Sequence, residues 1–330
     1  MGVRKRWGMW IVAALALAGM AVSAGWAEAA GWVPKEPVSM IVPGAAGGST
    51  DLLGRAVEKV WSKYCPQPLL VVNKTGGGGV VGATAVARAK PDGYTLALGY
   101  GSGHDLVMPH IQKVEYNPFR DLDPVARLSI HTVVVLVPAS SPVKNMKDLI
   151  ALAKKEGKPI TASVGLTAGA VDLVIRGIAS TTGIEITSIP HKGGAEAMTT
   201  LMGGQTTMGG GHPSEIIVPL KSNRIRAIAI ATPERDPSLP DVPTLIEQGI
   251  KFHTWGSVKG IAVPKNTPKE IVAYYADVFK KITSDPDFKK SMQDISQPVL
   301  YLGPEDFDKF MHRAYDDYGK LVKQLGLEQK

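Results

Sequence analysis

Short apolar runs alternate with amphipathic segments along most of the chain. The runs predict strands at Val38–Val42, Leu69–Val72, Tyr94–Leu98, Thr132–Val137, Ile160–Val164, Ile186–Ile189, Ile225–Ala231 and Gly260–Val263. The amphipathic segments predict helices from Asp51, over Val80–Ala89, over Met146–Glu156 and over Glu305–Leu325. This alternation is typical of right-handed β-α-β units, so the sequence predicts an α/β fold with mainly parallel sheets.

The segment after Asp51 shows the helical period clearly. Leu53, Val57 and Val60 recur at intervals of three or four, whereas Arg55 and Glu58 fall between them. One apolar stripe of this kind predicts a helix that packs against a sheet.

Two later helix starts carry local signals. Thr267–Glu270, with proline second, has the sequence of a capping box, and Asp285 stands directly before Pro286. Proline is favoured at the first helical position, so we expect helices to begin at both places.

The first 29 residues have the layout of an export signal. Arg4, Lys5 and Arg6 precede an apolar run from Met9 to Ala24, and the small residues of Ala27–Ala29 follow as a cleavage site. A membrane anchor is disfavoured because the run is shorter than the roughly 20 residues that a spanning helix needs. We therefore expect a signal peptide at 1–29 and a periplasmic mature protein.

Composition adds constraints. About 300 residues remain after the signal, more than one core usually serves, so two lobes are expected. With Cys65 as the single cysteine, no intramolecular disulfide can form. Loss of the signal lowers the formal net charge of +7 by two. The remaining basic residues form no stripe interleaved with aromatics, which argues against nucleic acid as a partner.

The stretch "VPGAAGGSTD", residues 42–51, is nearly bare of side chains. Bare backbone exposes amide groups, and the helix that follows adds the positive end of its dipole. The segment therefore predicts an anion-binding site. That anion could be a nucleotide phosphate, a reaction intermediate or a carboxylate ligand.

A nucleotide is disfavoured. Gly77, Gly79 and Gly82 fit a dinucleotide spacing, but no acidic residue ends a strand about twenty residues further on. Neither glycine cluster ends in the Gly-Lys-Ser/Thr of a phosphate-binding loop. We expect no cofactor.

Catalysis and metal binding also lack a local signature. The chain has no G-x-S-x-G elbow, and its histidines show no H-E-x-x-H spacing. The enzyme alternative is a secreted hydrolase or lyase that acts on a carboxylic ester or acid through Ser49 or Ser102 and a distant histidine. We expect no enzyme activity and no metal.

Polar or glycine-rich loops follow several of the predicted strands. They are Gly47–Asp51, Gly99–His104, Ser163–Asp172, His191–Glu196 and Gly209–His212. Ligands of open α/β sheets bind beyond the carboxyl ends of the strands, where such loops gather. A single loop of this kind is explained by a tight turn whose glycines adopt positive φ, but all these loops taken together favour a ligand cleft.

A series of short motifs, in a fixed order along the chain, points to one protein family. They are "IVPGAAGGSTD", "VVNKTGGGGVVGA", "AKPDGYTLALG", "DLDPVARL", "IPHKGGAEA", "LMGGQ", "IRAIAIATPERDPSLPDVPTLIEQG" and "AVPKNTP". In order and spacing they resemble the substrate-binding proteins of tripartite tricarboxylate transporters, the Bug family, over nearly all of residues 34–325.

The resemblance implies a two-lobed type II periplasmic binding protein fold with a cleft between the lobes. Lobe one would comprise residues 31–127 and 232–330, and lobe two residues 128–231. The protein would capture a small organic acid and deliver it to the integral membrane subunits of its transporter. Docking on a sensor kinase is a further alternative with the same cleft. We expect a monomer.

The expected ligand contacts come from both lobes. They are Gly47, Gly48, Ser49, Thr50, Asp51, Tyr100, Gly101, Ser102, His104, Thr167, Ala168, Asp172, Lys192, Gly193 and Gly194. Asp51 itself is expected to cap its helix, since its carboxylate would repel an anion. The chain departs from the family pattern at Gly44, His191, Thr207 and Asp172, so the resemblance names no particular acid.

Overall fold

The computed structural model describes residues 31–328. The signal sequence expected at 1–29 lies outside the described residues. Contacts divide the chain into the units Met1–Trp32 and Val33–Lys330, and the fold is that of the second unit. Within residues 31–328, no helix has the length and apolar character needed to cross a membrane.

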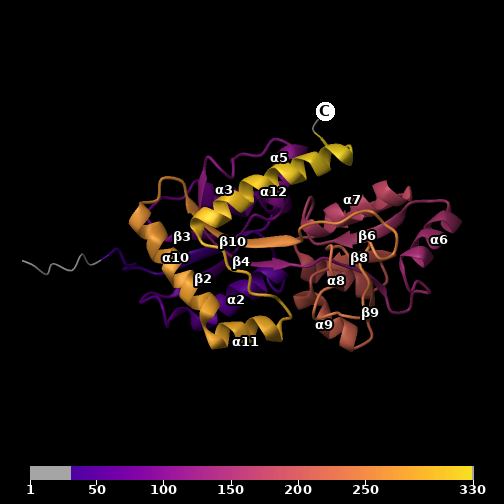
Figure 1. Cartoon of the computed structure of the whole chain (residues 1–330), viewed down its shortest axis with the longest axis horizontal. Coiled ribbons are helices and arrows are strands. Elements are labelled where there is room, and N and C mark those ends of the chain that lie inside the picture. The colour runs from indigo at the N-terminus through magenta and orange to yellow at the C-terminus, as the bar shows by residue number, and fades with distance from the viewer. Residues whose placement is uncertain (1–30, 329–330) are drawn as a thin grey trace, which may run out of the picture. The chain divides into compact units, whose positions relative to one another are not determined.

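Two five-stranded sheets organise the second unit (Figure 1). The first has the order β2 (Leu69–Asn73), β1 (Val38–Val42), β3 (Thr95–Tyr100), β10 (Ser257–Pro264) and β4 (Leu122–His131). The second has the order β7 (Ile186–Pro190), β6 (Ile160–Val164), β8 (Met208–Gly211), β5 (Val134–Pro138) and β9 (Ile225–Ile230). The α/β prediction is confirmed.

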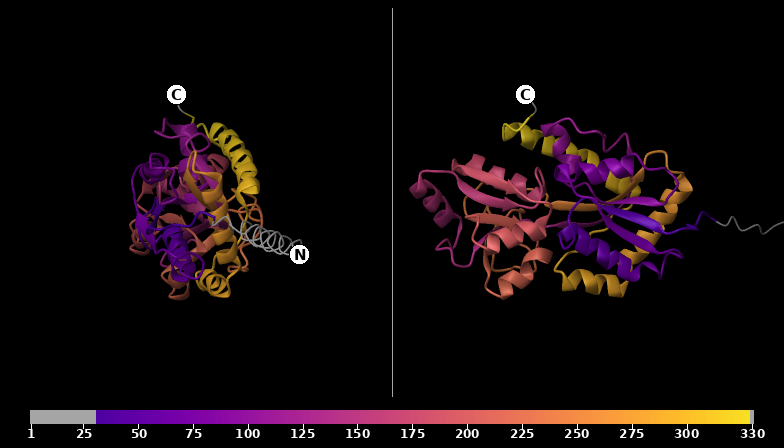
Figure 2. Two further views of the ribbon diagram at one scale, coloured as in Figure 1. Left: turned by 90° about the vertical axis from the view of Figure 1, so that its left-hand side faces the viewer. Right: turned by 180° about the vertical axis from the view of Figure 1, so that it is seen from behind.

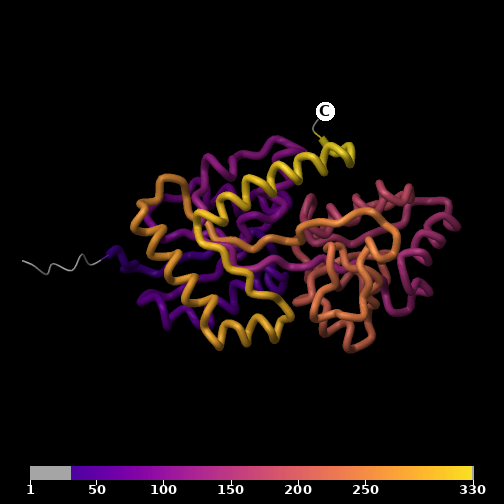
Figure 3. Tube along the Cα trace, in the orientation of Figure 1, coloured from indigo at the N-terminus to yellow at the C-terminus, as the bar shows by residue number. Residues whose placement is uncertain are grey.

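One strand in each sheet runs against the other four. β10 is antiparallel to β3 and β4, and β5 is antiparallel to β8 and β9. Both reversed strands enter from the other sheet, β5 shortly after β4 and β10 after the segment that follows β9 (Figure 3). A strand that enters in this way starts at the edge where its neighbours end, which accounts for the reversed direction.

Helices cover both faces of each sheet (Figure 2). On the first sheet, α2 (Ser49–Trp61), α10 (Lys269–Ser284) and α11 (Pro286–Asp294) contact one another, and α3 (Val80–Ala87), α4 (Gly103–Leu106), α5 (Met108–Ile111) and α12 (Pro304–Gln324) form a second group. A short 3₁₀ helix, η1 (Gly77–Gly79), precedes α3. On the second sheet, α6 (Met146–Glu156) and α7 (Ala170–Thr182) share one core, while α8 (Gly194–Met202) and α9 (Pro213–Lys221) share another.

The division into two lobes at residues 127/128 and 231/232 remains a prediction. Each sheet draws its strands from the segments expected for its lobe, except that β4 of the first sheet continues past residue 127 to His131. Between β9 and β10, however, Leu245, Ile250 and Phe252 pack into the core of the second sheet. The chain therefore leaves that core only close to β10.

Two local expectations need correction. The expected loop at Gly209–His212 is largely strand β8, which is buried at all four positions. Thr267 does not cap α10, because its hydroxyl donates to the carbonyl of Pro264 and Pro268 is the N-cap residue. By contrast, α11 begins at Pro286 as expected, and Asp285 caps it by accepting from the amides of Asp287 and Phe288.

Candidate functional site

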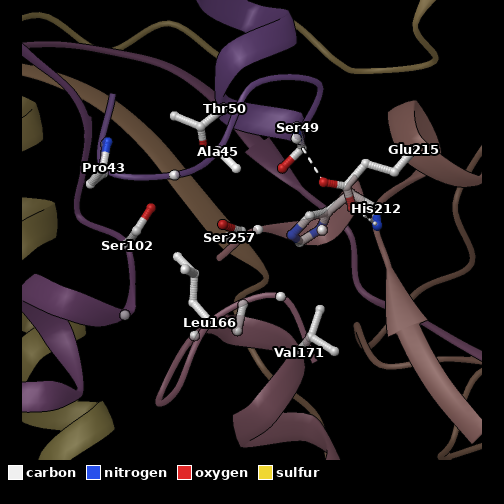
Figure 4. Close-up of a pocket in the computed structure, with 18 of the residues that line it drawn as sticks. Pro43, Ala45, Ser49, Thr50, Ser102, Leu166, Val171, His212, Glu215 and Ser257 are labelled. Carbon is white, nitrogen blue, oxygen red and sulfur yellow. Dashed lines mark hydrogen bonds between the residues drawn. The ribbon is translucent and has the colours of Figure 1, made fainter. Parts of the chain in front are cut away.

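A cavity of about 80 Å³ lies among loops that follow strands of both sheets (Figure 4). The first sheet contributes the loops after β1 and β3 and the start of β10. The second sheet contributes the loops after β6 and β7 and the start of α9. This is the edge where ligands of α/β sheets bind, as the loop pattern predicted.

The loop after β1 brings the N-terminus of α2 to the cavity. Gly47 has a φ of +78°, a conformation that side chains disfavour, and Gly48 is the N-cap residue. The amide of Ser49, the first residue of the helix, consequently faces the cavity region with no carbonyl of its own helix to bond.

Asp51 has a different role from the one expected. It is the third residue of α2 and not its cap. Its carboxylate accepts from the amide of Gly47 at 2.9 Å and from Asn73 Nδ2 at 3.1 Å, and it lies 3.4 Å from Arg55 Nε. Asp51 lines the cavity, but these partners use its carboxylate to hold the loop in shape.

Loops of the two sheets touch directly. The amide of Ala45 donates to the carbonyl of Lys192 at 3.0 Å, and the amide of Ser49 donates to Glu215 Oε1 at 2.7 Å. A Cβ atom on Gly103 would collide with the carbonyl oxygen of Ala168. Ligand entry therefore requires these contacts to open or an existing channel to admit the ligand.

Lys259, on β10, places an ammonium group at the cavity. Lys259 is 3% exposed, and its Nζ donates a hydrogen bond to Thr50 Oγ1 at 2.7 Å. Burial lowers the pKa of Lys259 to about 8, and the negative charge of Glu215 opposes that shift. The side chain is therefore mostly protonated at neutral pH, although no carboxylate of the described residues forms an ion pair with it.

Buried histidines surround this lysine. Burial lowers the pKa of His104 and of His212, and it lowers the pKa of His131 well below its ordinary value. His104 Nε2 lies 3.3 Å from the carboxylate of Asp105, and His212 Nδ1 lies 2.8 Å from the carbonyl of Thr132. The rings are thus neutral at pH 7 and add no positive charge to the cavity.

Several of the expected ligand contacts line the cavity. They are Gly48, Ser49, Thr50, Asp51, Ser102, His104, Gly193 and Gly194. Their meeting at one place agrees with the expected gathering of strand-end loops. Whether any of them contacts a ligand stays a prediction.

The other expected contacts lie outside the lining. They are Gly47, Tyr100, Gly101, Thr167, Ala168, Asp172 and Lys192. Tyr100 is buried with its hydroxyl on the carbonyl of Pro118, and the carboxylate of Asp172 accepts from Ala168 and Arg176. The side chain of Lys192 is exposed, and only its backbone joins the two sheets.

Three polar residues of the lining, Glu215, Ser257 and Lys259, were missed from the sequence, and a fourth, His212, ends an expected loop but was not among the expected ligand contacts. His212 and Glu215 follow the glycine strand β8, and Lys259 interrupts an otherwise apolar strand. A lysine within such a run was the available signal, because a buried charge needs a partner or a function.

Within residues 31–328, no cluster of three metal-ligating side chains is arranged to hold an ion. The hydroxyl of Ser102 donates to the carbonyl of Val258 at 2.8 Å and not to a histidine. The geometry thus offers hydrogen-bond donors, one buried cation and one carboxylate to a small molecule.

Comparison with known proteins places this arrangement in a family. A family model described as "Tripartite tricarboxylate transporter family receptor" matches residues 53–327. The structure of the periplasmic binding protein BugD is similar, with a TM-score of 0.83, 29% identity and coverage of 90% of this chain and 100% of that one.

Two further similar structures contain bound acids. Rpa4515 of R. palustris with adipate has a TM-score of 0.82 and 25% identity, and the match covers 89% of this chain and 98% of that one. MatC from Rhodopseudomonas palustris with bound malate has a TM-score of 0.81 and 26% identity, with 88% and 99% covered.

Proposed function

Because this chain belongs to the tripartite tricarboxylate transporter receptor family, whose members are periplasmic solute-binding proteins and not enzymes, we propose that its ligand is a small organic acid. The acid would occupy the cavity between the strand-end loops of the two sheets. Bound ligand would be presented to the integral membrane subunits of a tripartite tricarboxylate-type transporter.

One observation carries the proposal. The amide of Ser49 at the N-terminus of α2 already holds a carboxylate, that of Glu215, at 2.7 Å. A helix N-terminus favours anions, and Lys259 adds a buried positive charge beside it. Similar structures carry adipate and malate, which supports an acid in this place.

The strength of such a site is sufficient for a transport receptor. Hydrogen bonds to charged groups contribute about 1.5–3 kcal/mol each. Three or four of them approach the roughly 8 kcal/mol of micromolar affinity, before the cost of ordering the ligand and loops.

We further propose that the ligand draws the two lobes together. Loops of both sheets line the cavity, so a ligand between them would favour the form in which they touch. A few kcal/mol of difference in affinity is enough to shift such an equilibrium.

The test of the proposed function is native mass spectrometry of the protein purified from its own periplasm. We expect a retained molecule with at least one carboxyl group, and stoichiometric binding of that molecule without turnover. A retained nucleotide, or conversion of the bound acid to a product, would contradict the proposal. Copurification of membrane subunits from the same cells would support transport over sensing.

A further inference from the structure

The cavity contains two side chains of opposite charge that approach from different sheets. Lys259 comes from β10, and Glu215 comes from α9. They bond to the first two residues of α2, Lys259 Nζ to the Thr50 hydroxyl and Glu215 Oε1 to the Ser49 amide, both at 2.7 Å. Figure 4 shows the second of these bonds at the rim of the cavity.

Lys259 has unused binding capacity. An ammonium group has three donors, and among residues 31–328 the one hydrogen bond that Nζ makes is to Thr50. A buried charge without an ion-pair partner is costly, and removing that cost favours binding of an anion. A carboxylate of the ligand would provide the missing pair.

Glu215 occupies the place where a second carboxylate of a ligand would otherwise bind. Its Oε1 takes the amide of Ser49, and its Oε2 accepts from the amide of His212 at 3.1 Å. A Cβ atom on Gly194 would collide with this carboxylate, so the backbone of the second sheet encloses it closely. A further negative group here would be repelled.

The remaining titratable groups of the lining do not alter this balance. Asp51 lies 3.4 Å from Arg55, and burial keeps His104 and His212 neutral by lowering their pKa values. Lys259 and Glu215 are left as one positive and one negative charge. A ligand with one negative charge unbalances this pair less than a ligand with two.

We propose that Lys259 and Glu215 select the ligand class: an acid with a single carboxylate, which binds Lys259, and a hydroxyl or amino group, which donates to Glu215. Dicarboxylates of the same length are disfavoured because their second carboxylate meets that of Glu215. This inference rests on the proposed function and narrows it.

The test compares matched ligands by titration calorimetry at pH 7. The probes are linear dicarboxylates of three to six carbons and the ω-hydroxy and ω-amino monocarboxylates of the same lengths. For the wild type we expect the best monocarboxylate to bind at least tenfold more tightly than its matched dicarboxylate. Glu215→Gln should strengthen dicarboxylate binding at least tenfold, and Lys259→Met should weaken every acid at least tenfold.

Lys265→Met is the control, since its exposed side chain pairs with Asp123 outside the cavity, and thermal unfolding verifies that each variant is folded. Dicarboxylates that bind the wild type as tightly as their matched partners would overturn the inference while leaving the proposed function intact. An unchanged preference in Glu215→Gln would overturn it as well. Failure of the wild type to bind any acid of the series would contradict the proposed function itself.

Discussion

Glu215 Oε1 accepts a hydrogen bond from the amide of Ser49 at 2.7 Å, although 166 residues separate the two in sequence. The bond connects α9 of the second sheet to the first residue of α2 in the first. It places a carboxylate of the protein where the sequence predicted a carboxylate of the ligand. The site therefore contains an internal anion that shapes which external anion can enter.

Ligand affinity should depend on alkaline pH through Lys259. Burial lowers its pKa to about 8, so the free protein loses this positive charge as the pH rises through that value. Binding of a carboxylate requires the protonated form, and affinity should fall by up to about tenfold per pH unit above pH 8. Calorimetric titration of the retained acid between pH 6.5 and about 9.5 measures the effect.

The titratable groups around Lys259 would not produce the same fall in ligand affinity at alkaline pH. Glu215, His131 and His212 interact electrostatically with Lys259, and burial lowers the pKa of both histidines, so neither changes charge above pH 7. Lys259→Met should bind weakly and independently of pH in this range. Constant wild-type affinity across the range would show that Lys259 does not pair with the ligand.

Gly103→Ala should prevent the two sheets from meeting around a ligand. Its Cβ atom would collide with the carbonyl oxygen of Ala168, which is a backbone atom and not the end of a flexible side chain. We expect ligand affinity to fall at least tenfold, and the ligand-induced decrease in radius of gyration to disappear in small-angle scattering. Gly303→Ala is the matched control, because its Cβ atom would make only an ordinary contact 3.6 Å from Tyr301.

The loop after β1 can be tested with Gly48→Val. Gly48 has a φ of −76°, so the substitution is tolerated by the backbone itself. A Cβ atom there would lie 3.3 Å from the carbonyl of Ala45 and 3.6 Å from Glu215 Oε1, and the two methyl groups of valine would crowd the Ser49 amide further. Binding of the retained acid should be lost, with melting temperature affected less.

Gly44→Ala, in the same loop, provides the comparison. A Cβ atom on Gly44 would have no neighbour within 4 Å. We expect near-normal binding in calorimetry. Wild-type affinity in Gly48→Val would remove this loop from the site.

Asp285 should contribute to stability through the start of α11. Its carboxylate accepts from the amides of Asp287 and Phe288 at 2.7 and 3.0 Å and from the hydroxyl of Tyr64. Loss of such a cap costs about 0.5–2 kcal/mol. We expect Asp285→Ala to lower the free energy of unfolding by about that amount in urea denaturation, and Asp294→Ala, at an exposed position, to have little effect.

The stabilisation that Asp285 provides should decrease at acid pH. The Tyr64 hydroxyl and then Lys63 hold the pKa of Asp285 well below its usual range. A carboxyl group with a depressed pKa in the folded state contributes stability above its unfolded pKa, and this contribution is lost as the pH falls below about 4. The difference in stability between wild type and Asp285→Ala should therefore shrink toward acid pH. A difference that grew would contradict the assignment.

Much of the fold could be predicted because its signals are local. The apolar strands Val38–Val42 and Ile160–Val164 and the helix Met146–Glu156 have the bounds that the sequence indicated. β8 was missed because "MGGG" carries one side chain suited to a strand, and glycine is depleted in strands. Its glycines permit close packing instead: a Cβ atom on Gly210 would collide with Val171 at 2.7 Å.

The candidate site could be predicted only in part. Its loops follow strands, and sheet topology brings such loops together whatever their sequence separation. Lys259 gave only the signal of a lysine within an apolar run, and that signal did not predict its meeting with Glu215, which depends on which strand lies beside which. That the lysine of β10 reaches the start of α2 follows from the insertion of β10 between β3 and β4, which no local pattern encodes.

The position of β10 also determines the order in which the molecule can assemble during synthesis. All strands of the second sheet lie between residues 134 and 230, so that sheet can complete itself while later residues are still being added. β3 and β4 have no pairing partner between them until residues 257–264 emerge, since β10 separates them. The half of the protein that is made first is therefore finished last, and the cavity acquires its lysine in the same late step.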